Sequence, residues 1–392
     1  QAKATIAAVT ATGGRLTLVG LSCFEGLVKT DAQGTAEAKV LQLLDFLAES
    51  VPQEKHAYGM LLKSEIDHIR SLSSWYLMHE YLAEVNESLY FHEFMTRAAQ
   101  HSLQYLGESD IATMLTMNMP QQVGDTLRRL SGDIIQTEQY MDFVRNRLFR
   151  QTLLCHVERK LERALTGARV YALHAASNVQ PPDGLLDPNT TDAVSFTLGG
   201  SALTSSEPIV KAALLVLNDA WPCSLSFDEL FMAAGSRLRS GTAYEDATTL
   251  ARERDQLGAM LLRGYTAQLV SLSVEPRAVR KDVPARPLAT NLARVQANAG
   301  DKVATLLHEV ATLADLERLV LKHLDGVRDH AAIVELIVTE VLAGRVNLQH
   351  KGQAVTDATR ARELLGSAVG DLLKRLVSKN LVCPDGWPVK PA

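Results

Sequence analysis

The sequence is poor in cysteine and in aromatic residues. Its cysteines, Cys23, Cys155, Cys223 and Cys383, are far apart in a chain of 392 residues. This spacing offers neither a CxxC zinc half-site nor a disulfide framework. Aromatic residues make up 5%, and the net charge is only −5. The slight negative charge gives no general reason to bind nucleic acid or anionic lipid, and scattered thiols are typical of a cytoplasmic protein.

Long apolar runs are also missing. The longer ones, such as Ala212 to Leu217, fall well short of the roughly 18 residues that cross a membrane, and they suit core helices. The apolar stretch from Leu16 to Cys23 is too short for a secretory signal. We therefore expect no membrane association. Apolar residues still make up 46% of the chain, enough for a large core in two or three domains.

The glycine-rich loop of a Rossmann-type cofactor site is a further absence. The only candidates, Ala11–Gly20 (ATGGRLTLVG) and Leu198–Ala202 (LGGSA), lack both the E/D-x-G-x-G-x-G spacing and a following βαβ series. The sequence contains no P-loop, no G-x-S-x-G and no H-E-x-x-H. It therefore predicts no catalytic, cofactor-binding or metal-binding residues.

Helical periodicity dominates the first part of the chain. Apolar spacing predicts a helix over 36–51 and another near 55–72, with Tyr58, Leu61, Leu62, Ile66 and Ile69 facing inward. A third is predicted from Leu89 to Leu106, and the pattern from Gln121 to about Thr166 is helical again. We predict a helical domain over residues 1–177.

Turn-forming residues divide the rest. Residues 178–192 and 275–287 are rich in proline and polar residues, which is typical of linkers. Between them we expect a strand pair turning at Gly199-Gly200, three helices (208–221, 227–238 and 246–269) and a strand at 270–276. Helix, helix, helix, strand is the order of a winged helix. We predict a mainly α protein with winged-helix-like α+β domains at 193–276 and 288–392.

Two stretches of the first part resemble a known family. Tyr76–Pro120 (YLMHEYLAEVNESLYFHEFMTRAAQHSLQYLGESDIATMLTMNMP) and Glu138–His156 (EQYMDFVRNRLFRQTLLCH) resemble the methyltransferase regulatory domain of bacterial protein-lysine methyltransferases. Leu324–Ile333 (LDGVRDHAAI) and Leu372–Val382 (LLKRLVSKNLV) resemble the carboxy-terminal winged-helix portion of that family. In the family, a catalytic domain that binds S-adenosylmethionine precedes these parts.

The resemblance implies an accessory role in protein-lysine methylation. We expect a non-catalytic regulatory or substrate-presenting chain without the catalytic Rossmann domain. Its partners would be that domain, in cis or in trans, and a protein substrate. The chain alone would bind no cofactor, since S-adenosylmethionine would belong to the catalytic domain. The alternatives are a divergent methyltransferase and a winged-helix DNA-binding regulator. The DNA-binding alternative is disfavoured because the region from Glu207 to Glu275 contains six basic and nine acidic residues, whereas a DNA-binding surface is basic.

Eight polar residues in the resembling segments are candidates for a partner interface: His79, Glu80, His92, Glu93, Arg145, Asn146, Arg147 and Arg150. The histidines and glutamates would either hydrogen-bond within the helical core or face the catalytic domain. The arginines would either form ion pairs with Glu138, Asp142 or Glu158 on a solvated face, or dock an acidic partner. The sequence alone leaves both choices open.

Overall fold

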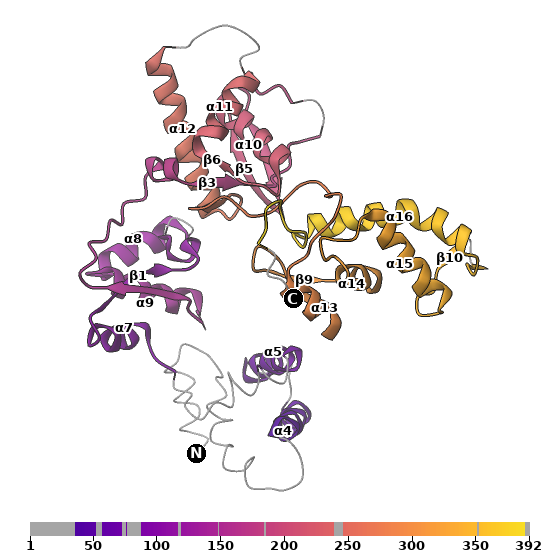
Figure 1. The fold of residues 1–392 in the computed structure, drawn as a ribbon. Coiled ribbons are helices and arrows are strands. Elements are labelled where there is room, and N and C mark those ends of the chain that lie inside the picture. The colour runs from indigo at the N-terminus through magenta and orange to yellow at the C-terminus, as the bar shows by residue number, and fades with distance from the viewer. Residues whose placement is uncertain are drawn as a thin grey trace. The chain divides into compact units, whose positions relative to one another are not determined.

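A computed structural model describes residues 36–51, 57–72, 76, 88–116, 119–147, 149–183, 186–238, 246–350 and 353–388 (Figure 1). The chain divides into two compact units, Gln1–Glu162 and Arg163–Ala392. Helices dominate both units, and the strands form small antiparallel sheets. The mainly α fold class is confirmed. The finer division into 1–177, 193–276 and 288–392 stays a prediction.

The first unit begins with two helices, α4 (Ala36–Ser50) and α5 (Ala57–Ser71). They pack through Leu44, Leu62, Ile66 and Ile69, each less than 5% exposed. The apolar spacing thus located both helices and most of their inward side chains. Tyr58 is an exception, because its side chain is 49% exposed, so the prediction that it faces inward is wrong.

The rest of the first unit alternates helices with a strand pair. The elements are α7 (Phe91–Ala99), β1 (Leu103–Glu108), η2 (Ile111–Met114), α8 (Gln121–Leu130), α9 (Ile134–Arg145) and β2 (Thr152–His156). Strand β1 pairs antiparallel with β2, from Leu103 opposite His156 to Glu108 opposite Thr152. Helix α7 buries Phe91, Met95 and Ala98, and Phe91 meets Tyr105 of β1 edge to face at 5.1 Å.

Two predicted helices in this region are wrong in part. The stretch 89–106 stops being helical after Ala99, because Ser102 takes a positive φ of 56° and β1 follows. The stretch 121–166 contains two helices and then strand β2. Both errors have one cause. The strands are stabilised by pairing with each other across some fifty residues, and local periodicity cannot report such pairing.

The second unit opens with η4 (Gly167–Ala172), β3 (His174–Ala176) and a hairpin of β4 (Val194–Leu198) and β5 (Ser201–Ser205). The hairpin turns at Gly199 and Gly200, with φ of 57° and 87°, a conformation that glycine adopts without steric cost. Three helices and a strand follow, as expected: α10 (Pro208–Ala220), α11 (Phe227–Leu238), α12 (Ala247–Thr266) and β7 (Ser271–Ser273). Strand β3 lies between β6 (Leu225–Ser226) and β7.

A second core lies toward the carboxyl end of this unit. It is built by α13 (Asn291–Ala299), β8 (Lys302–Ala304), β9 (Val310–Thr312), α14 (Asp315–Leu321), α15 (His330–Leu342), β10 (Gln349–His350), β11 (Gln353–Ala354) and α16 (Ala358–Ser378). Helices α15 and α16 supply most of its apolar side chains, among them Ile333, Ile337, Leu372 and Leu376. This core is separate from the one formed by α10, α11 and α12.

The two proline-rich segments are fastened to the unit. Lys211 of α10 is fully buried, and its Nζ donates to the carbonyl of Thr190 at 2.6 Å and to that of Asp192 at 3.1 Å. Arg280 forms an ion pair with Asp385 at 2.9 Å. The first segment thus binds a buried cation of α10, and the second contributes a buried cation of its own. No helix in the part of the chain that the structure describes is long and apolar enough to cross a membrane.

Candidate functional site

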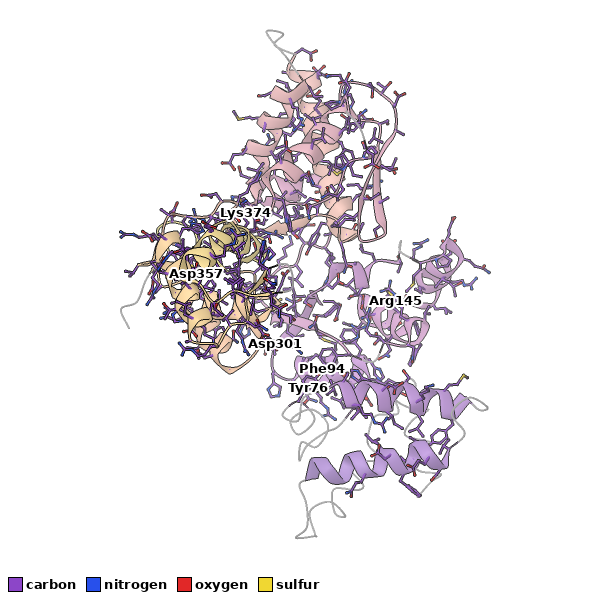
Figure 2. All side chains as sticks on the ribbon, turned by 90° about the vertical axis from the view of Figure 1, so that its right-hand side faces the viewer. Tyr76, Phe94, Arg145, Asp301, Asp357 and Lys374 are labelled. Atoms are coloured by element: carbon purple, nitrogen blue, oxygen red, sulfur yellow. The ribbon has the colours of Figure 1, made fainter. Side chains whose placement is uncertain are left out.

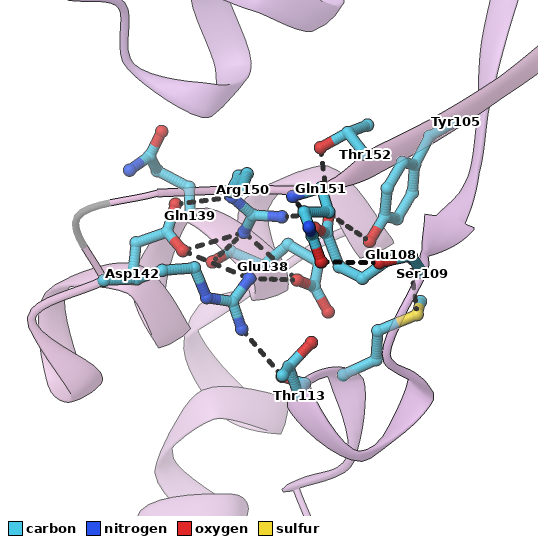
Figure 3. A network of polar contacts seen from close by, with 12 residues as sticks. Tyr105, Glu108, Ser109, Thr113, Glu138, Gln139, Asp142, Arg150, Gln151 and Thr152 are labelled. Carbon is cyan, nitrogen blue, oxygen red and sulfur yellow. Dashed lines mark hydrogen bonds and ion pairs between the residues drawn. The ribbon is translucent and has the colours of Figure 1, made fainter. Parts of the chain in front are cut away.

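A buried ion-pair network lies between α9, β1 and β2 of the first unit (Figure 3). Arg150 is at its centre. Its guanidinium meets Glu108 at 2.6 Å, Asp142 at 2.8 Å and Glu138 at 3.1 Å. The face of the same guanidinium lies 3.7 Å from the centre of the Phe91 ring. A planar, forked cation suits such a site, because it can bind carboxylates at its edge and stack on an aromatic face.

Glu108 ties the network to the strand pair. One of its carboxylate oxygens accepts hydrogen bonds from Tyr105 and Thr152 as well as from Arg150, and the other accepts from the backbone of Gln151. Burial, together with the charges of Glu138 and Glu108, raises the pKa of the Tyr105 hydroxyl, which therefore stays a proton donor. The two strands and α9 are thus joined by one set of polar contacts.

The other two arginines are also held inside the unit. Arg147 pairs with Glu138 at 3.3 Å and Asp142 at 3.4 Å, and it donates to the carbonyl of Thr113 at 2.7 Å. Arg145, labelled in Figure 2, donates to the carbonyls of Thr113 and Leu115. These bonds fasten η2 and the residue after it to the end of α9.

Asn146 has a backbone role at this point. It caps α9 in the left-handed conformation, with φ of 49°, and the backbone N–H groups of Asn146 and Arg147 both donate to the carbonyl of Asp142. Asparagine tolerates this conformation better than most residues. The turn it makes sends the chain from α9 back toward β2, which places Arg147 and Arg150 on the same group of carboxylates.

The network joins two arginines, Arg147 and Arg150, to three carboxylates, and burial affects the pKa values of these groups. Burial raises the pKa of Glu138 and of Asp142, and the neighbouring arginines offset this only in part. For Arg150, burial alone would lower the pKa, but its bonds to Asp142 and the charges of Glu108 and Glu138 outweigh that cost, so the pKa is raised. Arg150 therefore remains a cation in the folded protein at neutral pH.

His92 and Glu93 lie at the start of α7. The Glu93 carboxylate accepts a hydrogen bond from the backbone N–H of Tyr90 at 2.9 Å, which stabilises the first turn of the helix. The His92 ring contacts the side-chain oxygen of Gln139 at 3.1 Å and stacks on Tyr90 with ring centres 5.7 Å apart. His79 and Glu80 lie outside the described residues.

An exposed aromatic surface adjoins this helix start. Phe143 of α9 meets Tyr90 edge to face at 6.0 Å, and its side chain is 53% exposed. Tyr140 and Val144, 37% and 55% exposed, share that face of α9 because residues three and four apart lie on the same side of a helix. We call Tyr90, His92, Tyr140, Phe143 and Val144 the α9 aromatic face. Gln139, whose side chain contacts His92, directly follows Glu138 of the ion-pair network along α9.

The structure thus decides part of the choice left open by the sequence. The expected ion pairs with Glu138 and Asp142 are confirmed. The expected solvated face is wrong for Arg147 and Arg150, whose side chains are 10% and 14% exposed. Sequence reasoning missed Glu108, because only the pairing of β1 with β2 brings it to Arg150. It also missed Phe143, because helical spacing alone does not distinguish an exposed aromatic side chain from a buried one.

Neither a metal centre nor a cofactor loop is found in the described residues. Among them, no group of three His, Cys, Asp or Glu side chains is placed to hold a metal ion. The Leu198–Ala202 candidate for a cofactor loop joins two antiparallel strands. A Rossmann-type loop instead leads from a strand into a helix whose N-terminus faces the cofactor, so this candidate does not fit. The Ala11–Gly20 candidate lies outside the described residues.

Comparison with protein families supports both resemblances. Residues 73–156 match the family described as predicted methyltransferase regulatory domain. Residues 285–381 match the family described as PKMT, C-terminal winged helix domain. The ion-pair network and the α9 aromatic face both lie within the first match. The α10–α12 core lies between the two matches.

Related proteins extend the comparison to most of the chain. Uncharacterized protein RP789 of Rickettsia prowazekii (strain Madrid E) is 32% identical over 349 residues, which are 87% of this chain and 61% of RP789. Uncharacterized protein RP027 of the same organism is 24% identical over 60% of this chain and 96% of its own length. The chain therefore spans less than two thirds of RP789.

A solved structure shares the fold. PKMT2 from Rickettsia typhi, solved in complex with AdoHcy, superposes with a TM-score of 0.71 at 24% sequence identity. The superposition covers 92% of this chain and 72% of PKMT2. At this identity the likeness establishes the fold of the chain, and a part of PKMT2 lies outside it.

Proposed function

We propose that this chain is a non-catalytic regulatory or substrate-presenting module of an S-adenosylmethionine-dependent protein-lysine methyltransferase, acting through protein contacts. The observation that carries the proposal is the α9 aromatic face, an exposed aromatic surface on a buried ion-pair network. It lies in the segment that matches the methyltransferase regulatory domain. The partner we propose is the catalytic domain, either in the same polypeptide or in a separate one.

The physical case rests on rigidity and exposure. Aromatic side chains provide large contact areas at low entropic cost, and they are enriched where protein interfaces bind most strongly. Here Phe143 and Tyr90 hold each other edge to face, and His92 is fixed by Gln139. The network beneath them uses charged hydrogen bonds between three elements. A surface supported in this way is organised before the partner arrives.

The relatives indicate what the partner would be. PKMT2 was solved with AdoHcy, the product that S-adenosylmethionine leaves after it donates a methyl group. A part of PKMT2, and a larger part of RP789, lies outside the match to this chain. A cofactor-binding domain in those parts would complement the regulatory and winged-helix segments that are matched in this chain. We therefore propose that S-adenosylmethionine is bound by the partner domain.

Calorimetric titration of the chain with S-adenosylmethionine tests the non-catalytic assignment. We expect no heat of binding, because the one described glycine pair that could have formed a cofactor loop makes a hairpin turn. A stoichiometric response with a micromolar Kd would overturn the assignment, because it would show a cofactor site in the chain itself.

The contact surface needs a separate test. The partner to use is the part of Rickettsia typhi PKMT2 that lies outside the match, immobilised for biolayer interferometry. Replacing Phe143 and Val144 by serine should weaken binding of the chain at least tenfold, since loss of a central interface side chain costs about 2 kcal/mol or more. The control is Met232→Ser on α11, where another apolar side chain is 70% exposed. Equal binding by both variants would rule out the α9 aromatic face as the contact surface.

A further inference from the structure

Three aromatic rings of the second unit converge on a single arginine of α12. The guanidinium carbon of Arg254 lies 4.7 Å from the centre of the Tyr171 ring, 4.8 Å from Phe227 and 5.8 Å from Phe231. Tyr171 and Phe227 have ring centres 4.5 Å apart, and Phe227 and Phe231 are stacked at 6.4 Å. A cation over several ring faces is attracted by each ring's negative centre.

Two carboxylates also contact this group of side chains, one at Arg254 and one at Tyr171. Asp228 forms an ion pair with Arg254 at 2.7 Å, and its side chain is 66% exposed. Asp255 accepts a hydrogen bond of 2.6 Å from the Tyr171 hydroxyl. Three rings and two acids are the components of a site for an organic cation. Arg254 is the cation in place, and its own side chain remains 35% exposed, so solvent reaches the cation.

The rings are held by packing that does not involve Arg254. Phe227 is fully buried in the core of α10, α11 and α12. Phe231 lies one turn further along α11, on the same face. Tyr171 is fixed where η4 touches α12: a side-chain carbon added at Gly258 would stand 2.8 Å from the Tyr171 ring and 2.8 Å from the backbone of Gly167. The ring arrangement would therefore survive removal of the arginine head group.

We propose that Tyr171, Phe227 and Phe231 form a binding site for a methylated lysine side chain, which Arg254 occupies until it is displaced. The choice of ligand rests on the proposed function, since methylated lysine is the product of a protein-lysine methyltransferase. The site itself lies outside both segments that match family models. It would let the module retain or recognise a substrate that has already been modified.

Chemistry favours the methylated over the unmodified side chain. A lysine ammonium is a compact and strongly hydrated charge, whereas an ammonium that carries methyl groups loses little hydration when it enters an aromatic site. The methyl groups also add apolar contact with the ring faces. Asp228, released from Arg254, would balance the positive charge at the rim. A binding preference that grows with methylation is the expected signature.

Binding of lysine peptides by the full chain tests the proposal. The probes are one short peptide carrying trimethyllysine and the same peptide with unmodified lysine, read by fluorescence anisotropy. Removing the occupant in Arg254→Ala should strengthen binding of the trimethylated peptide about tenfold over wild type, with no gain for the unmodified peptide. A double variant that combines Arg254→Ala with Phe231→Ala should lose this gain in affinity for the trimethylated peptide. The control Arg237→Ala removes another ion pair of the same unit, with Asp219, and should behave as wild type.

Several outcomes would overturn the proposal. One is an Arg254→Ala chain that binds both peptides equally. Another is an equal gain in affinity for the trimethylated peptide in Arg254→Ala and in the double variant that also carries Phe231→Ala. Tighter binding of free choline than of the trimethylated peptide would reassign the site to a small quaternary ammonium compound. If Arg254→Ala fails to fold, Arg254→Gln removes the guanidinium that lies over the rings, shortens the side chain and gives the same readout. Failure here leaves the S-adenosylmethionine and catalytic-domain tests untouched, so the two proposals can fail separately.

Discussion

At the scale of single residues, Arg150 has more interactions than any other side chain of the candidate site. It faces three carboxylates that are each less than 13% exposed, and it covers the Phe91 ring. A buried group of this kind is stable only while its charges remain matched. Removing the arginine would leave Glu138 and Asp142 paired with Arg147, and it would remove the ion pair of Glu108 with Arg150.

Arg150→Met should therefore destabilise the first unit strongly. Methionine keeps the aliphatic stem but leaves carboxylates without their partner, which typically costs about 3–5 kcal/mol. Because the chain has two units, the readout should be local. Hydrogen exchange followed by mass spectrometry on peptides from residues 91–156 provides it.

The matched control is Arg128→Ala, which removes an ion pair with Asp125 at a site where both side chains are more than half exposed. Such surface pairs contribute about 0–1 kcal/mol, so exchange should hardly change. Wild-type protection in Arg150→Met would show that the network contributes little to stability.

Glu317 provides a prediction about pH in the second unit. Its side chain is 5% exposed and accepts hydrogen bonds from Lys379 at 2.6 Å and from Arg375 at 3.3 Å. Burial alone would raise the pKa of Glu317, but these bonds and one from the backbone of Ala314 outweigh it, so the pKa is lowered from its usual 4.5. A lowered carboxyl pKa stabilises the fold above the unfolded-state value, and this contribution is lost as the pH falls through the folded-state value.

Glu317→Gln should thus reduce the unfolding free energy by about 1.5 kcal/mol near neutral pH. The difference from wild type should shrink as the pH falls from about 4.5 through the lower folded-state pKa, where the wild-type carboxylate becomes protonated. Urea unfolding at a series of pH values measures it, with Asp315→Asn, fully exposed on the same helix, as the control. A difference that is the same at neutral and acidic pH would contradict the assigned pKa shift.

Sequence reasoning reached some of these residues and not others. Arg145, Arg147 and Arg150 stand out as a cluster, and Glu138 and Asp142 are close enough in sequence to be named as their partners. Glu108 could not be found in that way, because it lies 42 residues from Arg150 and reaches it only through sheet pairing. Burial of the cluster was equally hidden, since it depends on how α9 packs against the strands.

At the scale of elements, the same distinction holds between local and distant determinants. The helices 227–238 and 246–269 and the turn at Gly199-Gly200 follow from capping residues, apolar spacing and glycine, all of which are local signals. Strands β1 and β2 were predicted as helix, because their amide partners lie elsewhere in the chain. Close packing between elements is also invisible to periodicity, and the contact of η4 with α12 is an instance.

Gly258→Ala should loosen that contact. The new methyl group would stand 2.8 Å from the Gly167 carbonyl oxygen and 2.8 Å from the Tyr171 ring, so η4 and α12 must separate. Overpacking of this kind typically costs about 1–3 kcal/mol. Thermal unfolding monitored by circular dichroism would detect it as a lowered Tm.

A second helical glycine separates crowding from helix propensity. Gly366 of α16 has no neighbouring atoms within 4 Å of an added side-chain carbon. Alanine there should raise stability by about 0.5–1 kcal/mol, because it forms helix more readily than glycine. Stabilisation by both substitutions would mean that η4 and α12 are not in the close contact described.

At the scale of the whole molecule, the chain is organised as two units with different surfaces. The first unit has the α9 aromatic face, and the second has the aromatic rings around Arg254 and the carboxy-terminal core. The units meet in sequence between Glu162 and Arg163. The segment 157–166 that joins β2 to η4 has no regular secondary structure, and nearly all of its side chains are exposed. It contains the basic residues Arg159, Lys160 and Arg163.

Trypsin should separate the units within this segment. Proteases need an extended stretch of accessible backbone, which exposed connections offer and packed helices do not. The Gln104 side chain donates to the carbonyls of His156, Val157 and Arg159 at 2.7–3.2 Å, so cleavage should favour Lys160 and Arg163 over Arg159. Mass spectrometry of a limited digest should show a carboxy-terminal fragment that begins at Leu161 or Ala164 and resists further cleavage within α13–α16. Replacing both Lys160 and Arg163 by glutamine should slow the appearance of this fragment. Early cuts at Arg128, which is exposed within α8, would contradict the prediction, because they would show that a helix of the first unit opens more readily than the connection.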